Sequence, residues 1–577
     1  MKEWNESESV FTSWDGTRLF YRSWKIPESS NKALIFLHRG HEHSGRVAQQ
    51  VKELDMMDFQ AFCWDARGHG HSPGERGYAE NYAALVRDLD SFVKHISDTH
   101  GIPVENMAIV ANSVGAVTAS AWVHDYAPRI RAMVMAAPAF RIRLYVPFAI
   151  PGLRLLQKLK GKAFIKSYVK PKMLTHDPEQ SRHYEEDPLI TRNIAVNILL
   201  GLHDISTRVV ADAGAITVPT LVLSAGSDWV VKNPIQDLFY KRLSSPLKER
   251  EVFPGFFHGV LYEKNRYLAF DRARDFLREA FESEVDRSSL IESDKHGYTK
   301  KEFDSLKGPA SRMNAIRFGL QSLGMKLASK LSEGVRIGYE TGFDSGRSLD
   351  YVYANKATGK TFIGRMIDRA YLDSVGWKGI RERRFLIREM LRETIQEKLD
   401  KGESVRILDI ATGCGRYVLD ILKSFPDDDI QAILRDNVPG NLEQGRALAK
   451  EMNLENVRFE EGDAFDPEQI ASADQRPNIA IVSGLYELFP DNAMIQRSLE
   501  GVSTVLGEQG SLIYTGQPWH PDIEMIARTC INREGAPWIM RRRTQAEMDE
   551  LVRTAGLRKS DMKIDSFGIF TVSVARK

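Results

Sequence analysis

Short apolar runs alternate with helical patterns twice along this chain of 577 residues. The runs are 33–37, 107–111, 132–135 and 220–223 in the first half, and 405–409, 430–434, 479–482 and 511–514 in the second. Apolar runs of this length, separated by amphipathic helical segments, predict the strands of a largely parallel sheet and its crossover helices. We therefore expect an α/β fold with two separate sheets.

A polar stretch lies between the two alternations. Residues 284–310 are rich in Ser, Asp, Lys and Gly, which is typical of a linker. An apolar stripe at helical spacing follows it, made of Ile316, Leu320, Leu323, Leu327 and Leu331, with Arg317, Lys326 and Lys330 off the stripe. Such a helix either docks on its neighbouring domain or lies on a membrane surface, and both interpretations stay open.

These patterns predict three segments. Residues 1–283 form the first α/β domain, with a helical cap at about 141–210. Residues 284–345 form the linker and the amphipathic helix. Residues 346–577 form the second, Rossmann-like domain, with a helical cover at its N-terminal end.

The composition indicates the cellular compartment and argues against some classes of binding partner. The formal net charge of +1 gives no global argument for nucleic-acid binding. Cys63, Cys414 and Cys530 are scattered, which fits a reducing compartment. The N-terminus is polar, and no apolar stretch reaches the ~20 residues that span a bilayer. We expect a cytoplasmic protein, with peripheral contact to the inner face of the membrane left open.

A serine, an aspartate and a histidine follow strand-like runs in the first half. Ser113 comes after the run 107–111 and precedes Gly115, and a serine at such a tight strand-to-helix turn has its hydroxyl exposed above the sheet. Asp228 follows the run 220–223, the last of this half, and His258 lies further along the chain. The order Ser, Asp, His is that of a triad in which His258 takes the proton of Ser113 and Asp228 fixes the imidazole tautomer.

A serine nucleophile also needs donors for the oxyanion of its tetrahedral intermediate. The backbone N–H groups of Val114 and Gly40 are in the expected places, after the nucleophile and after the first run. Gly40 lies in the stretch His38-Arg-Gly-His-Glu-His43. Three histidines so close could bind a metal, but a loop after a strand favours the oxyanion site, and we predict no metal.

Together these residues resemble the monoacylglycerol lipase and lysophospholipase branch of the α/β-hydrolases, over about residues 10–280. The resemblance also rests on the stretch Asp65-Ala-Arg-Gly-His-Gly-His-Ser72. This sequence has Ala111 where the family has a glycine, and its loop reads His-Arg-Gly-His where His-Gly-x-Gly is usual. The resemblance implies hydrolysis of an acyl ester, such as a monoacylglycerol or a lysophospholipid, beneath a lid.

The predicted cap has an unusual charge pattern. Between Arg141 and Lys172 there are nine Lys or Arg residues and no Asp or Glu, interleaved with apolar side chains. A cationic, apolar cap would suit anionic lipids or an anionic bilayer surface. A helical cap with solvated basic residues is an equal alternative.

In the second half, Asp409 precedes a glycine-rich turn that contains Gly413 and Gly415. Asp436 follows the next run, and Asp463 lies further on in Gly-Asp-Ala-Phe. Glycines in such a turn allow the backbone to approach a nucleotide closely. Dinucleotide sites look similar, but here the acid precedes the glycines, a third glycine in dinucleotide spacing is missing, and the chain ends in an antiparallel hairpin pattern.

These features resemble the class I S-adenosylmethionine-dependent methyltransferases, over about residues 345–577. The resemblance implies that Asp409, Gly413 and Gly415 hold the methionine end of S-adenosylmethionine. It likewise implies that Asp436 binds the ribose and Asp463 the adenine. Ala411 stands where the family has its first glycine.

The methyl acceptor is harder to place, because methyl transfer needs little from the protein beyond positioning. Candidates past the strand ends are Tyr486, Glu487, Trp519 and His520. Arg541, Arg542 and Arg543 either hold a phosphate or carboxylate or form a solvated or salt-bridged run on the surface. We expect residues 351–384 to form a helical cover over the acceptor pocket.

The sequence thus predicts a bifunctional enzyme that cleaves an acyl ester and transfers a methyl group from S-adenosylmethionine, with small-molecule or lipid substrates and no nucleic acid. Fusion gives one site a high effective concentration near the other, so we expect one lipid-derived molecule to meet both. Two alternatives remain. The first half could be an inactive lipid-docking module, or the second half could bind the cofactor without transferring its methyl group.

Overall fold

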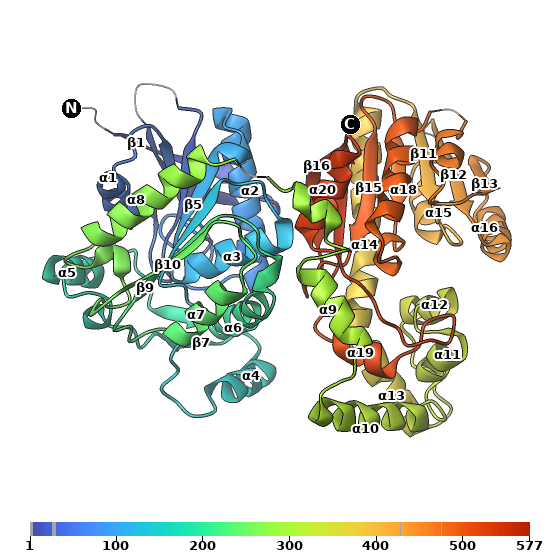
Figure 1. Ribbon diagram of the computed structural model, residues 1–577, viewed down its shortest axis with the longest axis horizontal. Helices are drawn as coiled ribbons and strands as arrows, with labels where there is room; N and C mark the ends of the chain where they lie inside the picture. Colours follow the sequence, from blue (N-terminus) through green and yellow to red (C-terminus); the bar gives the residue numbers. More distant parts are fainter. Residues whose placement is uncertain (1–3, 26–29, 285, 427–428, 475) are drawn as a thin grey trace. The chain divides into compact units, whose positions relative to one another are not determined.

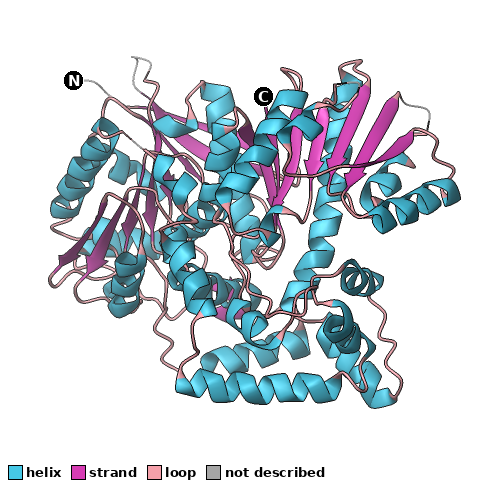
Figure 2. Ribbon diagram, turned by 45° about the vertical axis from the view of Figure 1, so that its right-hand side comes forward, coloured by secondary structure: helices cyan, strands magenta, loops and turns pink. Residues whose placement is uncertain are grey.

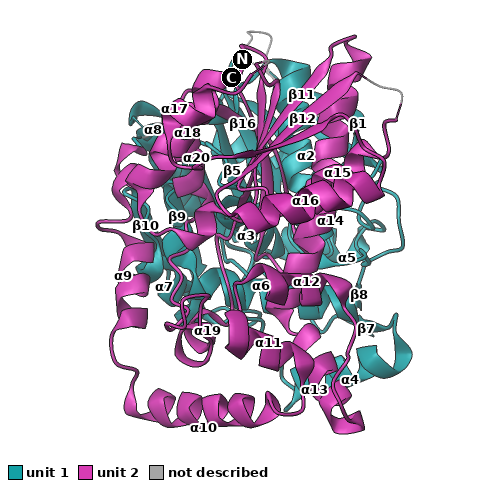
Figure 3. Cartoon of the chain, turned by 90° about the vertical axis from the view of Figure 1, so that its right-hand side faces the viewer, with its two compact units in different colours: residues 1–286 teal, residues 287–577 magenta. Residues whose placement is uncertain are grey.

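The computed structural model describes residues 4–25, 30–284, 286–426, 429–474 and 476–577. The chain divides into two compact units, Met1–Asp286 and Arg287–Lys577 (Figure 3). The first three residues of the polar N-terminus and residue 285 of the expected linker lie outside the described residues. Among the residues that are described, no helix combines the length and the apolar character needed to cross a bilayer.

The first unit is built on an eight-stranded sheet of order β1-β2-β4-β3-β5-β6-β9-β10 (Figure 1). The strands are β1 (Asn5–Thr12), β2 (Arg18–Lys25), β3 (Ala33–Leu37), β4 (Gln60–Trp64), β5 (Met107–Asn112), β6 (Ala132–Ala136), β9 (Thr220–Ala225) and β10 (Lys248–Phe253). Strands β4, β3, β5, β6, β9 and β10 are parallel, and β1 and β2 add an antiparallel edge. The four predicted strands are the central β3, β5, β6 and β9, and every residue in them is buried, as expected where helices cover both faces.

Helices lie on both sides of this sheet (Figure 2). They are α1 (Ala48–Leu54), α2 (Tyr82–His100), α3 (Val114–Tyr126), α7 (Asn233–Arg242) and α8 (Tyr267–Glu282). The insertion between β6 and β9 forms a cap from α4 (Ala149–Lys160), α5 (Pro178–Glu186), α6 (Val196–Ala211) and the short antiparallel pair β7 (Phe164–Lys166) and β8 (Asn193–Ala195). This is the α/β-hydrolase fold.

The second unit contains a seven-stranded sheet of order β13-β12-β11-β14-β15-β17-β16. The strands are β11 (Val405–Ile410), β12 (Ile430–Asp436), β13 (Val457–Glu461), β14 (Ile479–Val482), β15 (Ser511–Gly516), β16 (Arg558–Ile564) and β17 (Thr571–Arg576). The first five are parallel, and β17 is antiparallel to both β15 and β16. The predicted parallel strands and the terminal hairpin are confirmed, and the fold is Rossmann-like.

Helices flank this sheet and extend well below it in Figure 1. Around the strands lie α15 (Arg416–Leu422), α16 (Pro439–Glu451), α17 (Pro467–Ala471), α18 (Asn492–Val505) and α20 (Gln545–Thr554). The long α14 (Val375–Asp400) runs from the sheet into the helical layer of α9 (Tyr298–Lys307), α10 (Arg312–Ala328), α11 (Glu333–Thr341), α12 (Gly346–Ala354), α13 (Phe362–Leu372) and α19 (Ile523–Thr529).

The described part of the stretch expected to be a linker is structured and belongs to the second unit from Arg287 onward. Its polar residues make internal contacts. Arg528 donates to the carbonyl oxygen of Gly308 at 2.7 Å, and the N–H of Asn492 donates to the carboxylate of Asp294 at 2.8 Å. A polar composition therefore reflects hydrogen bonding to the second unit here, rather than an extended connection.

Candidate active sites

Ser113 occupies a strained turn between β5 and α3. Its backbone has φ 50° and ψ −107°, a conformation that only strong local constraints hold for a residue with a Cβ. Gly115 allows the turn to pack closely, because an added Cβ would lie 2.7 Å from the carbonyl oxygen of His38. The serine side chain is thereby fixed above the carboxyl end of the sheet.

Ser113, His258 and Asp228 form one hydrogen-bonded relay. Nε2 of His258 lies 2.8 Å from Oγ of Ser113, and Nδ1 lies 2.9 Å from Oδ2 of Asp228. Oδ1 of Asp228 accepts backbone N–H bonds from Val230 and Val231, at 2.7 and 2.8 Å. Burial opposes ionisation of Asp228, but His258 and these N–H groups outweigh it and lower its pKa. The ionised carboxylate thus favours the tautomer with the proton on Nδ1, which leaves Nε2 free to accept.

The expected oxyanion residues lie side by side. An added Cβ on Gly40 would be 3.0 Å from a methyl group of Val114. Two of the three histidines of the same loop have partners of their own: Nε2 of His38 accepts the N–H of Ala66 at 3.1 Å, and Nε2 of His43 lies 2.9 Å from Asp187.

Ser113 and His258 open onto an apolar cavity of about 180 Å³. Its walls come from the sheet loops and from the cap, including Ile165, Leu199 and Leu202. The arrangement therefore places a basic imidazole and a serine hydroxyl at one end of an apolar chamber, which suits an acyl chain whose ester lies at that end.

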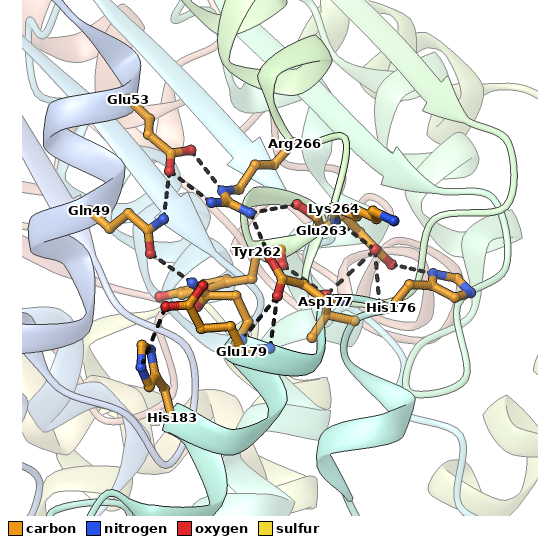
Figure 4. Close-up of polar contacts among 12 residues, drawn as sticks. Gln49, Glu53, His176, Asp177, Glu179, His183, Tyr262, Glu263, Lys264 and Arg266 are labelled. Carbon is orange, nitrogen blue, oxygen red and sulfur yellow. Dashed lines mark hydrogen bonds and ion pairs between the residues drawn. The ribbon is translucent and has the colours of Figure 1, made fainter.

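The buried Glu263 anchors the loop of His258 to the cap. No pattern in the sequence indicated this role. Oε1 of Glu263 accepts the N–H of Phe257 at 2.7 Å and lies 3.0 Å from Nδ1 of His176. Arg266 extends the network to Glu53 and Asp177, at 2.8 and 3.0 Å (Figure 4). The residue next to His258 is thus tied to the cap by an internal carboxylate.

In the second unit, the glycine-rich loop follows β11. Ala411, Gly413 and Gly415 all have positive φ, at 57°, 61° and 68°. Asp409 lies beneath this loop and is fully buried, and its oxygens accept hydrogen bonds from the hydroxyls of Thr412 and Tyr417, at 2.5 and 2.6 Å. Burial raises its pKa to about 7. In this structure Asp409 therefore holds the loop from below.

Asp436 and Asp463 lie at the carboxyl ends of the neighbouring strands. Asp436 ends β12, and its Oδ2 accepts the N–H of Gly413 at 2.8 Å. Asp463 follows β13 and is exposed, with Oδ1 accepting the N–H of Phe465 at 2.9 Å. Because β11, β12 and β13 are adjacent and parallel, these carboxylates share one edge with the glycine loop.

This edge fits an adenosyl cofactor. An added Cβ at Gly413 would meet no atom of the described residues within 4 Å, so one side of the loop is open space. Asp436 retains acceptor capacity beyond its N–H bonds, since an ionised carboxylate has about four lone-pair sites. Carboxylate acceptors and an open glycine backbone are the groups that ribose hydroxyls and a methionine moiety need.

A cavity of about 670 Å³ begins beside this edge. Gly484 and Glu487, which follow β14 next to β11, are part of its lining. The remaining lining is largely apolar and includes the aromatic side chains of Phe343, Tyr371, Trp377, Trp538 and Phe570. Residues of the expected helical cover at 351–384 thus contribute to the cavity wall.

Glu487 brings a carboxylate with one free oxygen to this cavity. Oε1 accepts hydrogen bonds from Arg383 and Thr515, at 3.0 and 2.9 Å. Oε2 is buried and has no hydrogen-bond partner among the described residues. Because Glu487 lines the cavity, a molecule bound there that reaches Oε2 would supply its missing hydrogen-bond donor.

His520 also lines the cavity, whereas Tyr486 does not face it. Nδ1 of His520 accepts the N–H of Asp522 at 3.0 Å, and burial lowers its pKa to about 4. The neutral ring therefore carries its proton on Nε2. The hydroxyl of Tyr486 lies 3.0 Å from Oγ of Ser498 in the core, so the structure assigns it a packing role.

Arg541, Arg542 and Arg543 are all buried. Arg541 pairs with Glu547 and Arg542 with Glu302, and Arg543 donates to the carbonyl oxygens of Tyr486 and Phe489, at 2.6 and 2.7 Å. The salt bridges expected in the second interpretation are present, but its surface position is wrong, because all three side chains are buried and bonded inside the unit.

Comparison with known proteins divides the chain close to the boundary between the two compact units, at Asp286 and Arg287. Residues 273–577 match the family model described as "Putative methyltransferase", and residues 28–265 match the model described as "Serine aminopeptidase, S33". Over 576 residues the chain is 46% identical to "Uncharacterized protein YnbC" of Escherichia coli (strain K12), covering 98% of both proteins.

Other similar proteins align with the first unit. The monoacylglycerol lipase of Mycolicibacterium smegmatis is 25% identical over 274 residues, which are 47% of this chain and 96% of the lipase. The crystal structure of Paleococcus ferrophilus monoacylglycerol lipase aligns with a TM-score of 0.40 at 21% identity, covering 48% of this chain and 99% of that one.

Proposed function

Since the chain belongs to the family described as "Putative methyltransferase" and joins it to an N-terminal hydrolase domain, we propose that it both hydrolyses an acyl ester and transfers a methyl group from S-adenosylmethionine. The observation that carries the first activity is the relay from Ser113 through His258 to Asp228 at the end of an apolar cavity. The second rests on the carboxylate-lined edge of β11 and β12 beside the large cavity.

In the hydrolysis, Oγ of Ser113 attacks the ester carbonyl carbon while Nε2 of His258 takes its proton. The N–H groups of Gly40 and Val114 stabilise the oxyanion. His258 then gives the proton to the leaving alcohol, and a water molecule releases the acyl group from Ser113 by the reverse sequence. Asp228 stays ionised and stabilises the imidazolium.

For the ester we propose a single-chain lipid, either a monoacylglycerol or a lysophospholipid. The apolar cavity beneath the cap accommodates an acyl chain, and the similar proteins include enzymes named as monoacylglycerol lipases. The cationic cap favours the anionic members of this class.

The test is labelling with a fluorophosphonate probe, followed by hydrolysis of a monoacylglycerol and of a lysophospholipid. Ser113→Ala should lose both the label and the hydrolysis, whereas Ser283→Ala, at an exposed serine of the same unit, should keep both. A folded wild-type chain that takes no label would instead support a lipid-docking role for this unit.

For methyl transfer, Asp436 and the Gly413 loop would hold the ribose and methionine parts of the cofactor, and Asp463 its adenine. S-adenosylmethionine, when bound, supplies a methyl group that is already activated on a sulfonium. Glu487 accepts a hydrogen bond, and then the proton, from the acceptor's O–H or N–H through its free oxygen. His520 donates from Nε2 to a second polar atom of the same acceptor.

This half is tested with labelled S-adenosylmethionine and separate lipid and water-soluble extracts of bacteria. Label in either fraction should be lost with Asp436→Ala and kept with Asp474→Asn, at a carboxylate that is 76% exposed. Cofactor binding without any labelled product would favour a sensing role. Label in the lipid fraction that also depends on Ser113 would place hydrolysis before methylation.

A further inference from the structure

Helix α10 has apolar side chains on two sides. Phe318 is buried, and Met325 and Ala328 line the large cavity. On the other side, Met313, Ile316, Leu320, Leu323 and Leu327 each expose between 56% and 83% of their surface. Their spacing of three and four residues places them on one face of the helix, so the exposed stripe is continuous.

The start of α13 continues this stripe. An added Cβ on Gly364 would lie 2.2 Å from the carbonyl oxygen of Leu331, so α13 begins against the end of α10. Figures 1 and 3 both show the two helices at the same end of the unit. Phe362, Ile363 and Met366 in the first turns of α13 are 71%, 60% and 58% exposed. We call these eight side chains the α10–α13 face.

The charges on the two segments that carry the α10–α13 face have one sign. No Asp or Glu occurs from residue 309 to 332 or from 355 to 367. The same stretches contain seven exposed cations: Arg312, Arg317, Lys326, Lys330, Lys356, Lys360 and Arg365. Glu524 of α19 contacts α10 at its start, where it accepts hydrogen bonds from Asn314. Exposed apolar side chains on segments whose own charges are all basic are the composition of an interfacial helix that binds anionic lipid.

We propose that the second unit docks through the α10–α13 face on a bilayer that contains anionic lipids. The apolar side chains would enter the boundary between headgroups and acyl chains, and the seven cations would meet lipid phosphates. A second copy of the chain fits less well, because a two-fold contact would bring these cations against their own counterparts. The docking does not depend on either proposed activity.

The position of the cavity relates this docking to the proposed methyl transfer. Gln321, Met325 and Ala328 on α10 line the same cavity as Glu487, and Leu320 and Leu323 lie on the outer side of the same helix. A docked α10 would separate the cavity from the lipid by a single helix. If methyl transfer takes place there as proposed, an acceptor would come from the membrane rather than from water.

The experiment is sedimentation of the full chain with vesicles of phosphatidylethanolamine and phosphatidylglycerol, compared with vesicles of phosphatidylcholine. We expect binding to the anionic vesicles that added salt weakens. The double variant Leu320→Glu/Leu323→Glu should weaken it at least about tenfold, because binding strength follows the buried apolar area. Phe385→Glu on α14, at a side chain that is 64% exposed, should bind like wild type.

The first unit needs its own control, because Leu155 and Leu159 of the cap are 58% and 75% exposed. Binding that is lost with Leu155→Glu/Leu159→Glu but unchanged in the α10 variant would overturn the proposal. So would a lipid-free dimer that the α10 variant dissociates. Hydrogen exchange gives the last control: protection of residues 312–328 that does not increase when anionic vesicles are added means that α10 does not dock on them, which also overturns the proposal. Thermal unfolding verifies that each variant is folded.

Discussion

Arg383 holds one oxygen of Glu487 and leaves the other bare. Nη1 of Arg383 lies 3.0 Å from Oε1, while Oε2 lacks a hydrogen-bond partner among the described residues. A buried acceptor left unsatisfied is costly, typically by about 1–3 kcal/mol. Such a cost at the wall of a cavity is expected where a bound molecule supplies the missing donor.

Glu487→Gln should therefore lower methyl transfer and leave the cofactor site intact. The amide keeps the shape of the carboxylate but cannot take a proton, so we expect single-turnover transfer to fall about 10²–10⁴-fold. The dissociation constant of S-adenosylmethionine, measured by calorimetry, should stay within about twofold of the wild-type value. This is a small energetic change, because a tenfold change in affinity corresponds to about 1.4 kcal/mol.

Glu508→Gln, at an exposed glutamate of the same unit, is the matched control and should transfer at the wild-type rate. If Glu487→Gln transfers as fast as this control, the acceptor's proton leaves by another route and Glu487 has no chemical role. If it also weakens cofactor binding strongly, Glu487 acts on the cofactor side instead.

Gly115→Ala should damage the nucleophile turn. The new methyl group would lie 2.7 Å from the carbonyl oxygen of His38 and 2.9 Å from Cβ of Leu37, so α3 must move away from β3 and carry Ser113 with it. We expect a loss of about 1–3 kcal/mol in the free energy of unfolding and a large loss of ester hydrolysis. Denaturant unfolding and probe labelling measure the two effects.

Gly152→Ala provides the comparison. It lies in α4, where an added Cβ meets no atom of the described residues within 4 Å. Alanine there should stabilise the helix by up to about 1 kcal/mol and leave hydrolysis unchanged. Equal behaviour of the two variants would show that close packing at Gly115 does not matter.

The central strands could be predicted because their residues are buried from both faces. The run Ala33–Leu37 is apolar at every position, as parallel strands between helical layers must be. The edge strand β10, with the sequence Lys-Glu-Arg-Glu-Val-Phe, could not be predicted in this way. Among the described strands it pairs only with β9, and Phe253 is its one buried residue, so its sequence has no apolar pattern.

Site residues could be predicted from the sequence where a turn fixes their position. They could not be predicted where the direction of the side chain decides whether it lines the site. Ser113 and Asp228 follow strands, so their loops could be placed from the sequence. Tyr486 and Glu487 are neighbours in a short 3-10 turn, and sequence offered both as acceptor-side residues. Successive side chains of such a turn diverge, and only Glu487 lines the large cavity while Tyr486 enters the core.

The pH dependence of the second unit should report on Asp409. Burial raises its folded-state pKa to about 7, above the unfolded value of about 3.9. Between these values the folded chain keeps a proton that the unfolded chain has released. The free energy of unfolding of the cofactor-free second unit should therefore fall as pH rises from about 4 to 7, by up to about 4 kcal/mol from this group, and then level off.

Asp409→Asn removes the ionisation and keeps a partner for the hydroxyls of Thr412 and Tyr417. Relative to wild type, this variant should gain stability between pH 5 and pH 8 in denaturant titrations. Asp474→Asn, at a side chain that is 76% exposed, should follow the wild-type curve. Parallel curves for wild type and Asp409→Asn would mean that Asp409 is ionised throughout and that the buried carboxylate is stabilised in another way.

Gly413→Ala separates the fold of the glycine loop from its proposed ligand. The neighbouring Ala411 already has a side chain at φ 57°, so the loop tolerates a Cβ in the left-handed region, at a cost of about 1–2 kcal/mol. The added Cβ of Gly413 points into space that is open within the described residues. The cofactor-free variant should therefore stay folded, while S-adenosylmethionine, which we place in that space, should bind at least about tenfold more weakly, equivalent to about 1.4 kcal/mol. Calorimetric titration measures this affinity.

An unchanged dissociation constant in a folded variant would mean that the cofactor lies elsewhere along the sheet edge. Asp436 and Asp463 would then no longer be its ribose and adenine partners.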